Sequence, residues 1–374
     1  MPTQEVALTP YFADLTDPRI DRTKKHRLID ILALTLCATI AGADTWEEVE
    51  RFGKAKHDWL KRFLQLPNGI PAHDTFNRVF AALDPKEFAA AVGRWMAAVC
   101  AATGLKQVAI DGKAARSAPR NTFSGCLHLV SAWATENHLI LGQEAVADGS
   151  NEIAAIPELL RVLELKGALV TIDAAGCQVE IAEQIRTQGG DYLLAVKGNQ
   201  PTLQTAVQAV FERACAVDFE GVRYDMHATT ESGHGRQEQR YVTVIYQPEG
   251  LPAEWPEVAA VVLVGRERKV NGKNVSTSHY YLTSRRAKAR QLGEAIRGHW
   301  GIENGLHWVL DVAFGEDTNS PRARHAGANL GLVRRLALSL LRQDPAKGSI
   351  KAKRLNAALD DNYLLRILQG IPEN

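Results

Sequence analysis

Between residues 107 and 201 the chain alternates short apolar runs with amphipathic stretches, and the order of these segments excludes most folds. Three strand-like runs come first, and the turn at Glu136-Asn137 joins the second and third as a hairpin. Helix-like and strand-like segments then alternate, as they do where crossover helices join parallel strands. The expected strands lie at 107–110, 127–134, 139–147, 168–172 and 192–196, and the expected helices at 153–165, 179–187 and from Pro201. This order predicts an α/β protein with a mixed sheet.

Two aspartates follow strands of the predicted sheet, Asp111 after the first and Asp173 after the fourth. In a mixed sheet of the ribonuclease-H type these two strands are neighbours, so we expect the two carboxylates to lie side by side. Adjacent bare carboxylates repel one another, and a divalent cation such as Mg²⁺ or Mn²⁺ between them relieves the repulsion. Simpler roles stay open, because Asp111-Gly112 is also a favoured hairpin turn and Asp173 can cap the following helix.

A third acid is expected from a helix packed across the sheet, and Glu303 is the candidate. At helical spacing His299, Glu303 and His307 share one face. Three glycines in this segment make it a poor helix by propensity, and they would let its backbone approach the sheet or DNA closely. Without the two aspartates, Glu303 would be interpreted as a surface carboxylate on an amphipathic helix.

The segments around this sheet differ from it in character. The first hundred residues carry helical patterns, with helix starts at Asp44-Thr45 and at His73-Asp74-Thr75. Short helices with basic residues between them suit DNA binding, and a structural or dimerising bundle is an equal alternative. The expected division is an N-terminal helical, DNA-binding domain at 1–104, a catalytic core at 105–218 and 285–343, a β-rich insertion within it at 219–284, and a helical tail at 344–374.

The composition is that of a folded protein without membrane segments. Hydrophobic residues make up 45% of the chain and charged residues 23%, which is ordinary for a globular protein. The longest apolar run, 31–43, is shorter than the ~20 residues that span a membrane, and no signal-peptide pattern is evident. We therefore expect a cytoplasmic protein. The five cysteines are scattered without a C-x-x-C pair, which argues against a disulfide framework or a cysteine-rich zinc module.

The net charge of +1 does not by itself indicate a nucleic-acid partner. Its distribution is uneven, because residues 285–374 contain 15 Lys and Arg against 9 Asp and Glu. This part of the chain holds basic runs at 285–290, 322–325 and 351–354. Such runs are usually solvated helix faces, and nucleic-acid contact is the alternative.

Four stretches together carry a family resemblance. They are VAIDGK at 108–113, TIDAAGCQ at 171–178, GDYLLAVKGNQP at 190–201 and HWGIENGLHWVLDV at 299–312. In this combination the sequence resembles the DDE transposases of bacterial insertion sequences, in the ISAs-type group also called the H-repeat-associated protein family. The resemblance extends from about Asp17 to beyond Leu341, almost the whole chain.

The resemblance implies a ribonuclease-H-like catalytic core with an acidic triad of Asp111, Asp173 and Glu303 that binds Mg²⁺, for which Mn²⁺ can substitute. It implies metal-dependent DNA strand cleavage at transposon ends, and strand transfer of the 3′-hydroxyl into target DNA, by two-metal phosphoryl transfer. The implied partners are inverted-repeat DNA at the transposon ends and target DNA, bound by a homodimer in the cytoplasm at the nucleoid.

Basic side chains near the acids are candidate phosphate contacts, with plain solvent exposure as the alternative for each. The candidates are Lys113, Arg116, Arg120, Lys197, Arg236, Arg297 and His299. The wider group carries a Tyr and an Arg before the third acid and a Lys after it, where this chain has Ile296, His299 and Leu310. A hairpin step on the flanking DNA is left open by these differences. We expect Trp300 and Trp308 in the core rather than stacked on bases.

Three other functions compete with this one. A zinc enzyme that used His299, Glu303 and His307 would leave both aspartates unexplained. A structure-specific DNA nuclease on the same fold would share every acid, but it would never join a 3′-end to a second duplex. A catalytically inactive, domesticated copy would only bind DNA, although all three acids are present in the sequence.

Overall fold

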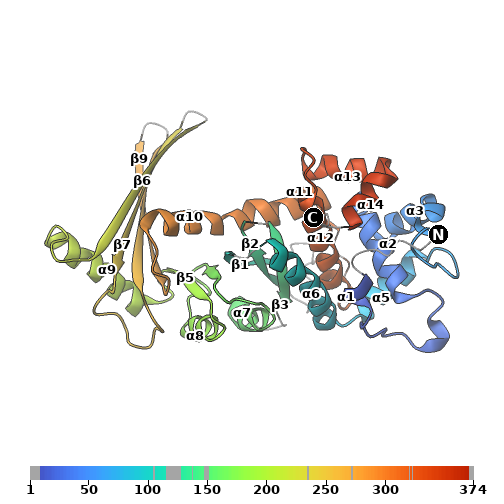
Figure 1. Cartoon of the computed structure of the whole chain (residues 1–374), viewed down its shortest axis with the longest axis horizontal. Helices are drawn as coiled ribbons and strands as arrows, with labels where there is room; N and C mark the ends of the chain where they lie inside the picture. The colour runs from blue at the N-terminus through green and yellow to red at the C-terminus, as the bar shows by residue number, and fades with distance from the viewer. Residues whose placement is uncertain are drawn as a thin grey trace, which may run out of the picture.

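The computed structural model describes residues 9–369 except 104–105, 115–127, 137, 147–150, 234–235, 271–272, 320 and 322. The molecule is elongated, with a mixed sheet in the middle, a helical part at one end and projecting strands at the other (Figure 1). The first and last described residues, 9 and 369, both lie in the helical part (Figure 1).

The N-terminal residues are helical, as predicted, and no strand occurs among those described before Gln107. The helix start expected at Asp44-Thr45 is confirmed as a capping box, in which the Thr45 side chain accepts a hydrogen bond from the Glu48 backbone and the Glu48 carboxylate accepts one from the Thr45 backbone. The elements are α1 (Thr9–Phe12), the 3₁₀ turn η1 (Asp21–Thr23), α2 (Leu28–Ile40), α3 (Trp46–Ala55), α4 (His57–Leu60), α5 (His73–Ala82) and α6 (Pro85–Thr103).

The described strands form one nine-stranded sheet in the order β3-β2-β1-β4-β5-β9-β8-β7-β6. β1 and β4 pair in parallel, as do β4 and β5, whereas β2 is antiparallel to β1 and β3. The expected succession of strands and helices is confirmed, and so is the pairing of the first strand with the fourth. The bounds are β1 (Gln107–Ala114), β2 (His128–Ala134), β3 (Leu139–Ala145), α7 (Glu152–Arg161), β4 (Leu169–Ile172), α8 (Val179–Thr187), β5 (Asp191–Val196) and α9 (Pro201–Ala216).

The first strand is longer than the sequence suggested. β1 continues through Asp111-Gly112 because β2 pairs with it along its length, with Asp111 opposite Ser131. The hairpin-turn interpretation of Asp111-Gly112 is therefore wrong. The Glu152 carboxyl at the start of α7 packs against Gly112, where a Cβ would lie 2.3 Å from its carboxyl carbon.

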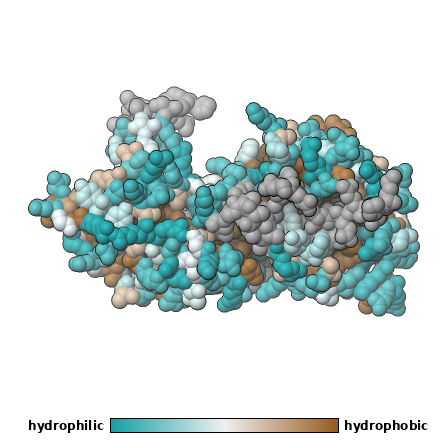
Figure 2. Space-filling view, in the orientation of Figure 1, coloured by the Kyte–Doolittle hydropathy of each residue, from teal (hydrophilic) through white to brown (hydrophobic). Residues whose placement is uncertain are grey.

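The β-rich residues continue the same sheet rather than forming a second one. β9 pairs antiparallel with β5, so that Leu282 lies opposite Leu194. The four added strands are β6 (Tyr224–Gly233), β7 (Arg236–Tyr246), β8 (Ala260–Val270) and β9 (Lys273–Thr283), each antiparallel to the next along the chain. Figure 2 shows a mostly hydrophilic surface, hollowed between these projecting strands and the helical part.

One long helical segment crosses the sheet and positions the site. α10 (Ala289–His299) packs on β1, β4 and β6–β8, on the face opposite α7 and α8 (Figure 1). Gln107 Nε2 at the start of β1 donates to the Ala295 carbonyl of α10 at 2.8 Å. The segment continues through a π-helical turn, η2 (Glu303–His307), into α11 (Trp308–Phe314).

The C-terminal helices join the N-terminal ones in one helical body. α12 (Ala326–Gln343) packs on α2, α5 and α6, and α13 (Ile350–Leu359) and α14 (Asp361–Gln369) close the same core. Arg354 is buried and pairs with Asp44 at 2.8 Å, and Lys353 Nζ donates to the Asp344 carbonyl at 2.7 Å. These two residues of the C-terminal basic run are therefore structural rather than a solvated face. No described helix is long and apolar enough to cross a membrane.

Candidate active site

Strand register brings the two aspartates to the same level of the sheet. Ile110 of β1 pairs with Ile172 of β4, and each aspartate is the next residue along its strand direction. Side chains alternate between the faces of a sheet, so Asp111 and Asp173 lie on the face that carries Thr171. That face is covered by α10, because His299 Nδ1 of this helix lies 3.1 Å from Thr171 Oγ1.

Different contacts hold the two carboxylates. Asp173 Oδ1 accepts hydrogen bonds from the backbone of Ala175 at 3.0 Å and of Gly176 at 3.4 Å. Asp173 does not cap α8, which starts after Gln178. Asp111 Oδ2 lies 3.3 Å from His307 Nε2. One aspartate is thus oriented by its own turn, and the other faces a histidine from the segment that carries Glu303.

Glu303 is the first residue of the π-helical turn and is exposed. Its segment lies close to the sheet because Gly298 lacks a side chain. A Cβ at that position would come within 2.9 Å of Thr135 Cγ2 and 3.0 Å of Gln107 Oε1. The expected close approach to the sheet is therefore confirmed at Gly298, whereas a Cβ at Gly301 would meet nothing within 4 Å.

The π turn has a specific partner on α12. Arg342 donates a hydrogen bond to the Gly305 carbonyl inside the turn, and its guanidinium lies 4.6 Å from the centre of the Trp133 ring. Burial lowers the pKa of Arg342 to about 10, so the group stays charged at neutral pH. A π turn leaves backbone carbonyls out of the regular helical ladder, and such turns often occur at functional sites. Arg342 satisfies one of them.

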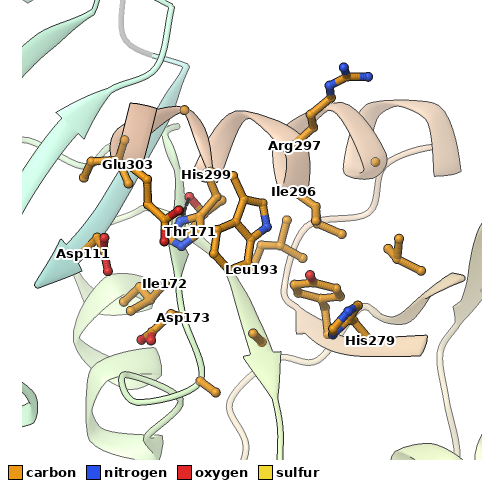
Figure 3. Close-up of a pocket in the computed structure, with 18 of the residues that line it drawn as sticks. Asp111, Thr171, Ile172, Asp173, Leu193, His279, Ile296, Arg297, His299 and Glu303 are labelled. Atoms are coloured by element: carbon orange, nitrogen blue, oxygen red, sulfur yellow. Dashed lines mark hydrogen bonds between the residues drawn. The ribbon is translucent and has the colours of Figure 1, made fainter. Parts of the chain in front are cut away.

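All three acids line one cavity of about 780 Å³. Figure 3 shows Asp111, Asp173 and Glu303 at one end of it, with His279 and Arg297 toward the other. That second end is basic, with side chains from β7, β8 and α10 and from the end of β5. Its cations are Lys197, Arg240, Arg266, Arg268 and Arg297. The cavity is therefore acidic at one end and basic at the other.

Two of the expected phosphate contacts are not supported. Lys113 has only 12% of its side chain exposed and is engaged by carboxylates, with Asp311 in contact and Glu316 at 3.3 Å. His299 is 8% exposed and is held against Thr171, and burial lowers its pKa despite the opposing effect of Asp111 and Asp173. A buried neutral imidazole and a buried, paired ammonium do not offer charge to DNA.

The other expected contacts fall into three groups. Lys197 and Arg297 line the cavity, Lys197 exposed after β5 and Arg297 paired with Glu231 of β6. Arg236 is the first residue of β7, and its side chain is outside the described part of the structure. Arg116 and Arg120 lie outside the described residues.

We did not predict Arg240, Arg266 and Arg268 as site residues. Arg266 and Arg268 are two residues apart in a strand-like segment, and this spacing could have placed both side chains on one face. The expectation of core tryptophans is wrong, since Trp300 is 44% and Trp308 60% exposed. Trp300 lines the cavity beside Glu303.

The donor set at the acidic end fits a hard divalent cation by type, because carboxylate oxygens are what Mg²⁺ and Mn²⁺ prefer. As these side chains lie, no three His, Cys, Asp or Glu groups within the described ranges form a metal-holding cluster. Binding of a cation by the three acids would need their side chains to draw together across the cavity.

Comparison with known proteins identifies the family. Residues 86–340 match the model of the transposase DDE domain, and residues 9–96 match the model of its associated N-terminal region, named DDE_Tnp_1-associated. The chain is 40% identical over 375 residues to "Putative transposase YncI" of Escherichia coli O157:H7, covering 98% of this chain and 95% of that protein. It is 37% identical over 372 residues to "H repeat-associated putative transposase YhhI" of Escherichia coli K12, covering 97% and 98%.

Among solved structures, the chain aligns with the piggyBac transposase in its synaptic complex with hairpin DNA. The TM-score is 0.43 at 10% identity, over 95% of this chain and 76% of the other. That score is too low to support a shared fold.

Proposed function

This chain belongs to the family of DDE transposases related to the H repeat-associated proteins, and on that premise we propose that it cleaves DNA at transposon ends and transfers the 3′-hydroxyl into target DNA. Asp111, Asp173 and Glu303 are the proposed catalytic acids. The observation that carries the proposal is that these acids, from three distant segments, line one cavity.

We propose that β1–β5 and the helices around them form a ribonuclease-H-like core. The support is the order β3-β2-β1-β4-β5, with an antiparallel hairpin on one side of β1 and parallel strands on the other. We propose that the chain divides into functional parts at 1–104, 105–218, 219–284, 285–343 and 344–374. In it, the helices before Gln107 bind DNA and the β-rich residues interrupt the core.

DDE transposases generally use divalent metal ions, and the three acids are the proposed ligands. When bound, Mg²⁺ or Mn²⁺ would neutralise charge on the scissile phosphodiester and activate the attacking oxygen, as in two-metal phosphoryl transfer. The Asp173 side chain suits this role, because it lines the cavity and its two backbone hydrogen bonds both use Oδ1. Lys197 and Arg297, on the cavity wall, would hold the DNA backbone.

The proposed partners are the inverted-repeat DNA at the element's ends and the target DNA. Two ends must be held together for transfer, so we propose a homodimer on DNA, acting in the cytoplasm at the nucleoid.

The test uses a mini-element that carries the inverted repeats flanking this protein's own gene, incubated with the full chain and Mg²⁺. We expect 3′-end cleavage and joining to a second duplex. Asp111→Asn should abolish both while DNA binding persists, and Asp218→Asn, at an exposed position far along the chain, is the matched control. Unchanged cleavage by Asp111→Asn would refute the catalytic assignment, and cleavage without joining would indicate a nuclease.

A further inference from the structure

The basic end of the cavity is a cross-strand cluster built around one carboxylate. Glu238 and Arg240 lie two residues apart on β7, opposite Arg268 and Arg266 of β8 respectively. All four side chains therefore lie on one face of the sheet. Glu238 contacts each guanidinium, at 2.6 Å to Arg240, 3.2 Å to Arg266 and 2.7 Å to Arg268.

The cluster carries more positive charge than its single carboxylate neutralises. Three guanidiniums and one carboxylate leave a net charge of +2. Arg240 and Arg266 are like charges directly opposite one another, an arrangement that destabilises a sheet unless something else compensates. Each guanidinium has five N–H donors, and buried Arg240 Nε has no hydrogen-bond partner in the part of the chain that the structure describes.

The cluster faces the same cavity as the acids, at a defined distance from them. The sheet order places β4, β5 and β9 between β1 and β8. With strands spaced about 4.8 Å apart, β1 and β8 are roughly 19 Å apart. The register also sets Arg266 four residues and Arg268 six residues beyond the level of Asp111, which adds about 13 and 20 Å along the strands. The acids and these arginines are therefore roughly 23 to 28 Å apart. Since a DNA strand rises about 3.4 Å per nucleotide, this separation corresponds to roughly seven to eight nucleotides.

Resting on the proposed function, we propose that Arg240, Arg266 and Arg268 bind the phosphodiester backbone of the DNA strand whose scissile phosphate lies at the acidic end. Guanidiniums match phosphate geometry with paired donors. Glu238 is a positioning residue, because it holds three mutually repelling groups toward one anion site. The acidic end repels DNA before any cation is bound, and the cluster supplies the compensating attraction within the same cavity.

The test measures DNA affinity by fluorescence anisotropy against NaCl concentration, with the full chain, without divalent metal, on the duplex carrying the flanking inverted repeat. Each lost phosphate contact lowers the slope of log K against log salt by about 0.9. Arg266→Gln with Arg268→Gln should lower it by about 1.8. Arg161→Gln is the matched control, since it also removes an arginine paired with a glutamate, but on α7, away from the cavity. A slope equal to that of the control would overturn the proposal.

Three further measurements separate positioning from charge and do not depend on the double variant Arg266→Gln with Arg268→Gln folding. Arg266→Lys with Arg268→Lys keeps both charges and should keep the slope. Glu238→Gln makes the chain more positive, yet we expect weaker binding, because the repelling guanidiniums separate; tighter binding would refute the positioning role. With the unaltered protein, methylphosphonates roughly seven to eight nucleotides from the cleavage position should lower the slope, and methylphosphonates at the far end of the duplex should not.

Failure of this inference is distinguishable from failure of the proposed function. If the unaltered chain cleaves and joins DNA but neither the arginine variants nor the methylphosphonates change the slope, the function stands and the phosphate site is wrong. If the slopes change as expected but no cleavage occurs with Mg²⁺, the phosphate site stands and the transposase chemistry is wrong.

Discussion

Replacing Glu316 by glutamine should destabilise the fold more than any single surface change. Glu316 is buried after α11, where its Oε1 lies 2.5 Å from Arg335 Nη1 and its Oε2 lies 3.3 Å from Lys113 Nζ. The Arg335 side chain is 1% exposed and that of Lys113 is 12% exposed. Glutamine has nearly the same shape but no charge, so the substitution leaves both cations buried without this carboxylate.

Removing one partner of a buried ion pair lowers the free energy of unfolding by about 3–5 kcal/mol, and we expect a loss of this size for Glu316→Gln. Burial alone would raise the pKa of Glu316, but the nearby charges of Arg335 and Lys113 outweigh it and lower the pKa. The folded protein therefore holds Glu316 ionised at neutral pH. Lys113 retains Asp311 as a partner, so most of the loss is expected at Arg335.

Urea titration at pH 7 measures the change in free energy of unfolding. Glu158→Gln is the control, because it breaks a pair with Arg161 whose side chains are 46% and 62% exposed, and such surface pairs contribute only about 0–1 kcal/mol. A loss for Glu316→Gln no larger than that of the control would refute the reasoning. Lys113 lies two residues after Asp111, so the same variant should also lower the cleavage rate at temperatures where it stays folded.

Three other outcomes follow from the same contacts. Gly298→Ala should lower the free energy of unfolding by roughly 1–3 kcal/mol through overpacking, since the new Cβ would meet Thr135 at 2.9 Å; thermal melting measures it. Arg342→Met removes the charged donor to the Gly305 carbonyl, which should lower stability by about 1.5–3 kcal/mol and lower the cleavage rate of the mini-element. The lowered pKa of Glu316 stabilises the fold above its unfolded value of 4.5, so stability should fall as pH drops below that value, as urea midpoints at successive pH values would show.

A matched control variant tests each of these three predictions. Gly301→Ala should be neutral or stabilising, because its Cβ meets nothing within 4 Å and alanine favours helix; equal losses at Gly298 and Gly301 would contradict the packing argument. Arg342→Lys keeps the charge and should recover part of the stability. Glu316→Gln should show a smaller loss of stability between neutral and acid pH than the unaltered chain.

The elements that could be predicted from the sequence are those that depend on residues close together along the chain. The Thr45 capping box, the helix from Pro85 and the alternation of strands and helices after Gln107 all follow from side chains within one turn or one strand. The pairing of β1 with β4 followed from their order alone.

The elements that sequence missed depend on distant partners. The Asp111-Gly112 dipeptide is typical of a turn, and only the pairing of β2 along β1 keeps it extended. The π turn at Glu303–His307 depends in part on Arg342, a residue of another helix. Lys113 follows an acid-bearing strand like a phosphate ligand, but three carboxylates beyond α10 engage it. These partners are far away along the chain, so a pattern of neighbouring residues does not include them.

The net charge of the whole chain does not reveal the local positive charge at the cavity. The net charge of +1 averages over the whole sequence, and two of the three cations in the basic run at 351–354, Lys353 and Arg354, are buried. The arginines that face the cavity are separated along the chain and converge only because β7 and β8 pair in one register, with Arg240 opposite Arg266. A shift of that register by one residue would turn one strand's charges to the other face. The proposed electrostatic attraction for DNA therefore depends on strand pairing, and variants that disturb the β7–β8 register should weaken DNA binding without changing the net charge.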